Sequence, residues 1–169
     1  MHKAKELQYH TKMINSGRYV NDSMGRYIGK KVVKKIISQG KNILGAHVLV
    51  MGMTFKENVS DIRNSKVADI INEFKDFGAE VDVMDPFASP LEVLQEYGIR
   101  LVERPGKKYD AVVVAVAHTT YLKLDESYFM SITNEHAVLA DVKGVYRGSI
   151  HQMIYCCLLY TSPSPRDIS

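Results

Sequence analysis

The stretch of sequence that decides the fold reads Ala46-His-Val-Leu-Val-Met-Gly-Met-Thr-Phe-Lys-Glu-Asn-Val-Ser-Asp-Ile-Arg-Asn-Ser65. It opens with a compact apolar run from Ala46 to Met51, continues through a polar loop that begins at Gly52, and leads into a segment with helical periodicity. A strand that is apolar on both faces is typical of a parallel sheet covered by helices on each side. This stretch therefore predicts the first strand, loop and helix of an α/β domain.

Three further apolar runs repeat the pattern downstream. They lie at Glu80 to Met84, Ala111 to Val116 and Ala137 to Ala140. Stretches that could form helices separate them, so the runs are expected to be parallel strands in the same sheet. The sequence predicts a layered domain of the βαβ type.

The helices between these strands have clear starts and stops. Ser65 to Phe77 places Val67, Ile70, Ile71 and Phe74 on one face, and Gly78 follows where a left-handed residue ends a helix. Pro90 to Tyr97 predicts a second helix with proline at its start. A third is expected between Tyr121 and Ile132.

An amphipathic helix is also expected upstream, from Asn21 to Ile37. Met24, Tyr27, Ile28, Val32 and Ile36 recur there at steps of three and four residues. Gly40, Asn42 and Gly45 then interrupt the pattern and predict a connector. The expected division is therefore a partial helical region at 1–45 and a complete domain at 46–155.

Charge and hydropathy narrow the possible partners. Residues 1–45 carry ten Lys and Arg side chains against Glu6 and Asp22, within a chain of net charge +3. Because no aromatic interleaving or nucleic-acid motif accompanies this charge, a solvated helix face is favoured over a nucleic-acid surface. No apolar run approaches the roughly 20 residues that span a bilayer, and no export signal is visible. We expect a cytoplasmic protein with neither membrane nor nucleic acid as partner.

The end of the chain differs from the rest. Its cysteines, Cys156 and Cys157, are adjacent, which supports neither a disulfide framework nor a metal site. The string Cys157-Leu-Leu-Tyr-Thr-Ser-Pro-Ser-Pro-Arg-Asp167 looks like translated sequencing-adapter DNA. Residues 156–169 are therefore expected to be a non-native, disordered tail.

The loop from Gly52 to Asn64 is the best candidate for chemistry. Ligands of open α/β sheets bind outside the carboxyl ends of the strands. Lys56 and Arg63 supply cations there, and Ser65 or Asn64 could cap a helix whose N-terminus favours anions. A phosphate-bearing ligand fits this combination, although neither a G-x-G-x-x-G turn nor a Walker lysine is present. A structural loop with incidental charges is an equal alternative.

The unbroken pattern from Gly52 to Lys66 resembles the signature loop of the C-terminal domain of UDP-glucose/GDP-mannose dehydrogenases. Its form is that of UDP-N-acetylglucosamine or UDP-N-acetylmannosamine 6-dehydrogenases. Segments at 2–7 and 16–24 are similar to the central dimerisation region of that family, and Asp85-Pro86 and Asp141-Val-Lys-Gly144 to its turns. The resemblance covers roughly residues 2 to 155. It implies a Rossmann-like parallel sheet preceded by part of a helical dimerisation region.

The resemblance also implies roles for particular residues. Phe55 and Lys56 match positions that contact the UDP-sugar, and Lys143 matches a basic position near it that is Arg in the UDP-glucose branch. Arg63 matches a contact to the NAD pyrophosphate. Arg18 is a further candidate for the substrate, with a plain surface arginine as an equal alternative. His118, in contrast, is expected to be only a polar strand-end residue that caps the following turn.

By this resemblance the intact enzyme would oxidise C6 of a UDP-N-acetylhexosamine to a carboxylate with NAD, for polysaccharide precursor synthesis. The glycine-rich NAD-binding domain and the catalytic cysteine of the family have no counterpart in the sequence, so NAD would be bound mainly elsewhere and this chain is expected to be inactive. Its expected partners are a UDP-sugar and a second copy, through the helix from Asn21 to Ile37. The alternative is a nucleotide-binding or dimerisation module without catalysis.

Overall fold

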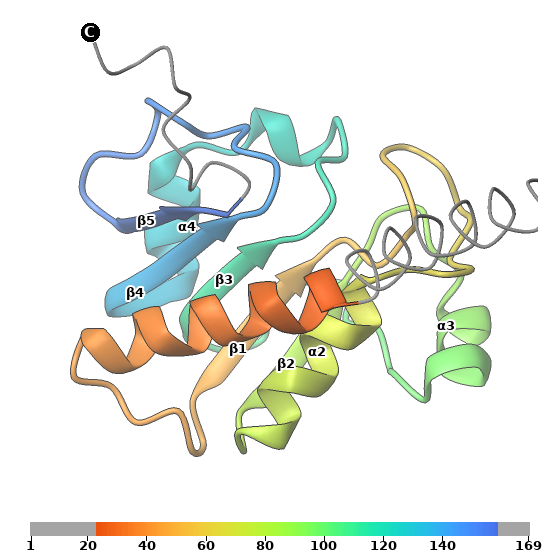
Figure 1. The fold of residues 1–169 in the computed structure, drawn as a ribbon. Helices are drawn as coiled ribbons and strands as arrows, with labels where there is room; N and C mark the ends of the chain where they lie inside the picture. Colours follow the sequence, from red (N-terminus) through yellow and green to blue (C-terminus); the bar gives the residue numbers. More distant parts are fainter. Residues whose placement is uncertain (1–22, 159–169) are drawn as a thin grey trace, which may run out of the picture.

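The computed structural model describes residues 23–158, which form a five-stranded, all-parallel sheet flanked by helices (Figure 1). The strands follow the order β2-β1-β3-β4-β5. Their bounds are β1 His47–Met51, β2 Glu80–Met84, β3 Tyr109–Val114, β4 Thr133–Asp141 and β5 Ile154–Cys157. A helix over residues 23–38 precedes them, and α2 Val67–Asp76, α3 Pro90–Tyr97, a 3-10 turn at Tyr121–Lys123 and α4 Glu126–Ile132 connect them. The prediction of a Rossmann-like α/β fold is confirmed.

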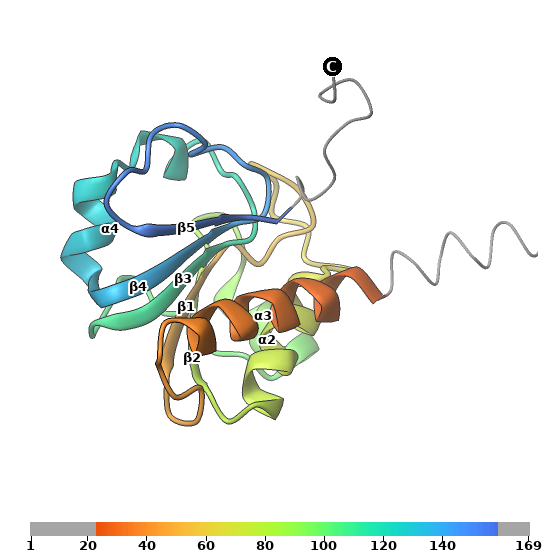
Figure 2. The ribbon, with the colours of Figure 1, turned by 60° about the vertical axis from the view of Figure 1, so that its left-hand side comes forward.

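The sheet has an apolar core on each face. In β1, Val48 and Val50 join the core under α2, whereas Leu49 and Met51 join the core under α4. Figure 2 shows α4 on one side of the sheet and the helix over 23–38, α2 and α3 on the other. Because successive strand residues point to opposite faces, both faces need apolar side chains, which explains the continuous apolar runs.

The N-terminal helix belongs to this same core. Ile28, Val32 and Ile36 are buried in one cluster with residues of β1 and α2. A Cβ on Gly25 would lie 2.6 Å from Asp69 Cβ, and one on Gly29 would lie 2.8 Å from Glu73 Cβ. The two glycines therefore allow the helix to approach α2 closely. Much of the apolar stripe that was expected to contact a second copy is therefore covered within the chain, and the residues on either side of the predicted connector at 40–45 share one core.

The C-terminal strand was not predicted. Residues 138–141 of β4 pair with residues 154–157 of β5, so Cys156 and Cys157 lie within the sheet. Cys156 and Cys157, which the sequence assigned to the tail, therefore belong to the sheet, because strand pairing depends on contacts with β4 that the local sequence does not reveal. Residues 159–169, like Arg18 and Asn21, lie outside the described residues.

Helix ends follow local chemistry. Ser89 caps α3 by accepting a hydrogen bond from Glu92 N, and Gly98 ends α3 in the left-handed conformation. At α2 the cap position is Lys66, without a side-chain cap, but the Ser65 hydroxyl accepts a hydrogen bond from Val67 N at 3.3 Å. Over residues 23–158, no helix is long and apolar enough to cross a membrane, and no cluster of side chains suited to a metal ion occurs.

Candidate functional site at the carboxyl edge of the sheet

The candidate loop, residues 52–66, follows β1 at the carboxyl edge of the sheet. The strand order changes direction between β1 and β3, and ligands of open α/β sheets bind at such a switch point. Gly52 has φ +97°, and a Cβ there would lie 2.5 Å from the Cβ of Val116. Only glycine satisfies both demands, so it lets the loops after β1 and β3 meet.

Asp85, just beyond β2, anchors the start of this loop. Its Oδ2 accepts hydrogen bonds from Met53 N at 2.6 Å and Thr54 N at 3.1 Å, and its Oδ1 accepts from Phe87 N and Ala88 N at 2.7 and 2.9 Å. Burial raises the pKa of this carboxyl, but hydrogen bonds from His118 and the backbone outweigh burial and hold it well below its usual value. Asp85 is therefore an ionised anchor for two loops.

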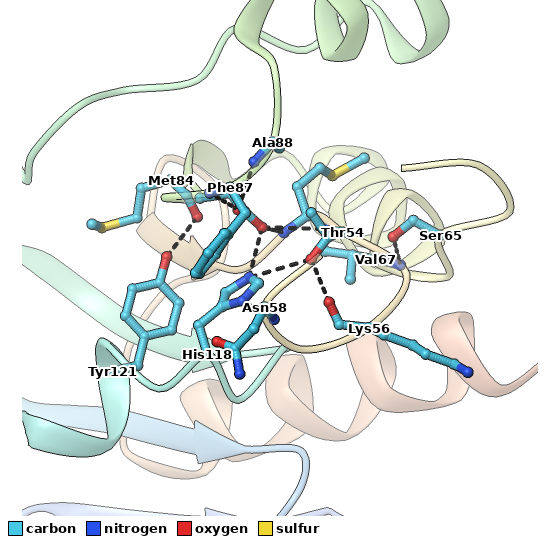
Figure 3. A network of polar contacts seen from close by, with 12 residues as sticks. Thr54, Lys56, Asn58, Ser65, Val67, Met84, Phe87, Ala88, His118 and Tyr121 are labelled. Carbon is cyan, nitrogen blue, oxygen red and sulfur yellow. Dashed lines mark hydrogen bonds and ion pairs between the residues drawn. The ribbon is translucent and has the colours of Figure 1, made fainter. Parts of the chain in front are cut away.

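His118, after β3, completes this network and is fully buried (Figure 3). Asn58 N donates to its Nδ1 at 3.0 Å, which requires Nδ1 to carry no proton. Its Nε2 then bears the hydrogen and faces Asp85 Oδ2 at 3.0 Å and Thr54 Oγ1 at 3.3 Å. The Thr54 hydroxyl donates to Lys56 O at 2.9 Å, so its lone pairs can face that N–H. The neutral tautomer of His118 with its hydrogen on Nε2 therefore fits Asn58 N, Asp85 Oδ2 and Thr54 Oγ1.

Two aromatic rings pack against the imidazole. The Phe87 ring centre lies 4.9 Å from that of His118, and the Tyr121 ring meets it edge-on at 5.4 Å. The turn after His118 is closed by its backbone carbonyl, which accepts from Tyr121 N. His118 thus closes the following turn, but it does so through its backbone carbonyl, and its side chain has a further role that was not predicted: it holds the loop after β1.

The outer side of the loop presents Phe55 and Lys56. The Phe55 side chain is 53% exposed, and Lys56 Nζ lies 5.5 Å from the centre of its ring. Figure 3 shows the Lys56 side chain extending away from the buried network. An exposed aromatic ring beside an ammonium group can stack on a flat group and attract an anion.

Lys143 joins the same surface from the loop after β4. Its Nζ lies 3.2 Å from Glu57 Oε1, and Glu57 follows Lys56 in the chain. Asp141 fixes the turn that carries Lys143 by accepting from Gly144 N at 2.7 Å and Tyr146 N at 2.8 Å. The structure therefore brings three candidate residues, Phe55, Lys56 and Lys143, to two loops that touch.

Arg63 has a different setting at the far end of the loop. Its side chain is 80% exposed and holds Asp61 through two hydrogen bonds of 3.0 and 2.9 Å. This pairing lowers the pKa of Asp61 to about 2. Arg63 also lines a cleft of about 440 Å³ together with Asp61, Glu92 and Glu96. The cleft is therefore rich in carboxylates.

An open parallel sheet with helices on both faces and a cationic loop at its carboxyl edge defines a Rossmann-like domain of the ligand-binding type. Residues 49–148 match the UDP-binding domain of the UDP-glucose/GDP-mannose dehydrogenase family. The chain belongs to this family.

The chain is also similar to named members of this family. The chain is 39% identical over 143 residues to the UDP-N-acetyl-D-glucosamine 6-dehydrogenase of Pseudomonas aeruginosa. The aligned region covers 84% of this chain and 34% of that protein. The chain is 37% identical over 145 residues to the enzyme of that name from Salmonella typhi, covering 85% and 34%. The native structure of the UDP-N-acetyl-mannosamine dehydrogenase Cap5O from Staphylococcus aureus superposes with TM-score 0.69 and 28% identity, covering 88% and 34%. The chain thus spans about a third of the length of these relatives.

Proposed function

We propose that this chain supplies part of the UDP-sugar site of an NAD-dependent UDP-N-acetylhexosamine 6-dehydrogenase. The observation that carries the proposal is the 3.2 Å contact between Lys143 and Glu57, because it joins the turn after β4 to the loop that presents Phe55 and Lys56. Two ammonium groups on adjoining loops suit a diphosphate, and an exposed ring suits a flat base or a sugar face.

The ligand would lie on the outer side of the loop. At the switch point itself the space between β1 and β3 is filled, since Thr54 is 1% exposed and the side chains of His118 and Asp85 are fully buried. Phe55 and Lys56 instead face outward. A site so open needs a second surface to enclose the ligand, and the chain spans only about a third of its relatives. We infer that another part of the intact enzyme provides that surface.

The intact enzyme would oxidise the C6 hydroxyl of the sugar to a carboxylate, with NAD as the oxidant. The residues of this chain do not by themselves fit NAD. The sequence contains no G-x-G-x-x-G turn, and Arg63 is already paired with Asp61 in a cleft that Glu92 and Glu96 also line. Arg63 is at most one contact to a cofactor held elsewhere, so we assign no hydride-transfer step to this chain.

We also propose that the chain alone has no dehydrogenase activity. Its cysteines lie in β5, and burial raises the pKa of the Cys156 thiol, which opposes thiolate formation. No side chain of the site is therefore assigned a catalytic role. NADH formation from UDP-N-acetylglucosamine and NAD by the purified chain would contradict this.

The test of the UDP site is calorimetric titration of the chain with UDP and with UDP-N-acetylglucosamine. We expect measurable binding, weakened by clearly more than about tenfold by the double substitution Lys56→Ala/Lys143→Ala, since two charge-assisted contacts are lost. Absence of binding to the unaltered chain, or equal binding by the double variant, would overturn the proposal.

A homodimer of the intact enzyme through the helix over residues 23–38 is part of the same proposal, but only part of the apolar stripe of that helix is open to a second copy. Ile28, Val32 and Ile36 are covered within the chain, whereas Met24 and Ile37 on the same helix are 37% and 51% exposed. Less apolar surface is therefore available for a partner. Sedimentation of the chain at two concentrations measures this: a dimer weakened by Ile37→Glu supports contact through residues 23–38, and an unaffected dimer refutes it.

A further inference from the structure

We propose that Asn58 and His118 form a clamp that positions Phe55 and Lys56 for the UDP-sugar. This inference rests on the proposed function, and it assigns a positioning role to two residues that touch no ligand. The clamp joins the loop after β1 to the loop after β3, residues that lie 60 positions apart in the sequence.

The clamp is reciprocal. Asn58 N donates to His118 Nδ1 at 3.0 Å, and Asn58 Oδ1 accepts from both the backbone N and the hydroxyl of Thr119 at 2.9 Å. Asn58 has φ +59°, a left-handed conformation that asparagine tolerates better than most residues. One residue thus uses its backbone and its side chain to hold two consecutive residues of the opposite loop.

The far side of the clamp is rigid. The His118 ring packs against the Phe87 and Tyr121 rings, and its Nε2 faces Asp85, which is itself fixed by four backbone N–H groups. A mobile His118 side chain could not hold Asn58 in one place. Because the His118 side chain is buried and fully hydrogen-bonded, the core of the domain sets the position of Asn58.

Phe55 and Lys56 depend on such a frame. Their side chains are exposed, so their direction follows from the backbone. That backbone is held at Thr54 by Asp85, at Phe55 by Asp61 O, which accepts from Phe55 N at 2.7 Å, and at Asn58 by His118. A loop fixed before binding loses less conformational entropy when the ligand arrives. The clamp therefore acts on affinity without touching the ligand.

The test compares Asn58→Gly, which keeps the left-handed backbone but removes the side-chain acceptor, with Thr119→Val and the double variant. Asp125→Ala is the matched control, because the exposed Asp125 Oδ1 likewise accepts from one backbone N and one hydroxyl, at Tyr128 and Ser127. Amide hydrogen exchange without ligand and the dissociation constant for UDP are measured for each variant.

We expect faster exchange at Phe55, Asn58 and Thr119 and a dissociation constant raised about fivefold in Asn58→Gly. Thr119→Val should have a smaller effect that disappears in the Asn58→Gly background, because the two side chains share one hydrogen bond. Asp125→Ala should change neither quantity at the loop.

The outcomes separate the two proposals. Unchanged exchange in Asn58→Gly would overturn the role of the Asn58 side chain in the clamp whether or not UDP binds. Faster exchange with an unchanged UDP dissociation constant would overturn its positioning role. Failure of the unaltered chain to bind UDP would overturn the proposed function and the positioning role with it, while the exchange data would still decide whether the clamp exists. Nitrogen NMR of His118 provides one more check: a proton on Nδ1 would contradict the tautomer on which the clamp depends.

Discussion

Thr54 and Phe55 are neighbours in the sequence but differ completely in their surroundings. Thr54 is 1% exposed and hydrogen-bonded to Asp85 and Lys56, whereas Phe55 is 53% exposed. The buried side of the loop, formed by Thr54 with Asp85 and His118, has every polar group paired. The exposed side, formed by Phe55 and Lys56, projects into solvent. Within one short loop, Thr54 thus helps to fix the backbone conformation, whereas Phe55 and Lys56 are available to contact a ligand.

This division makes a general prediction: substitutions on the buried side should cost stability as well as any affinity that depends on the shape of the loop, whereas substitutions of Phe55 and Lys56 should cost ligand affinity alone. The two effects are measured separately, by unfolding and by titration with UDP. A large loss of stability on substitution of Phe55 or Lys56, or unchanged stability on substitution of Asp85, would contradict this division.

The largest effect is expected for Asp85→Asn. Each carboxylate oxygen accepts two backbone N–H groups, so an amide must turn its NH₂ toward donors on one side. Leaving buried donors unsatisfied costs about 1–3 kcal/mol each, so we expect a loss of about 3 kcal/mol in the free energy of unfolding. Urea denaturation at neutral pH measures it. Asp125→Asn is the control, because an exposed helix cap tolerates asparagine and should change little.

The pH dependence of stability follows from the same carboxyl. Because folding lowers the pKa of Asp85, its contribution is present above the unfolded pKa of about 3.9 and is lost as the pH falls toward the lower folded pKa. The unaltered chain should therefore lose stability below about pH 4 more steeply than Asp85→Asn. Parallel slopes for the two proteins would mean that other carboxyls dominate acid unfolding.

On the exposed side, Lys56→Ala should lower UDP affinity by about tenfold, or about 1.4 kcal/mol, through the loss of one charge-assisted contact to phosphate. Its stability should stay within about 0.5 kcal/mol of the unaltered chain, as for other surface substitutions. Lys75→Ala, at the end of α2, removes an equal charge from another exposed position and should not affect binding. Equal losses for both lysines would point to general electrostatic attraction and would remove the case for a specific site.

The sequence predicted much of this framework because the relevant signals are local. The bounds of β2 and α3 match the prediction residue for residue, and the loop at the carboxyl edge follows from the order of strand, loop and helix. Proline at the first turn of α3 and Gly98 after its last residue are start and stop signals that need no tertiary information.

The parts that sequence reasoning missed depend on contacts between distant residues. Asp85 and His118 are 33 positions apart, and only the sheet brings them within hydrogen-bonding distance. β5 is recognisable only through its pairing with β4. The amphipathic helix was recognised, but its partner was not, although Gly25 and Gly29, four residues apart, provided a signal for close packing against another helix.

The smallest effect is expected where the two sides of the loop meet, at Glu57. Its carboxylate lies 3.2 Å from Lys143 Nζ, and hydrogen bonds from its own backbone and from Lys143 hold its pKa below the usual value, so it is ionised at neutral pH. A bound diphosphate would have to share Lys143 with this carboxylate and would also be repelled by it. Glu57→Gln should therefore raise UDP affinity about twofold at low salt, with little change in stability, because partly exposed ion pairs contribute about 0–1 kcal/mol.

The salt dependence and a double-mutant cycle decide whether this reasoning about Glu57 holds. At high salt the gain should vanish, because screening weakens both the ion pair and the repulsion. In the Lys143→Ala background the gain should shrink, since only the direct repulsion of phosphate remains to be relieved. If Glu57→Gln weakens binding instead, the carboxylate holds Lys143 in its binding position and does not compete for it. The turn after β4 would then belong with Thr54 and His118 among the residues that hold the shape of the site.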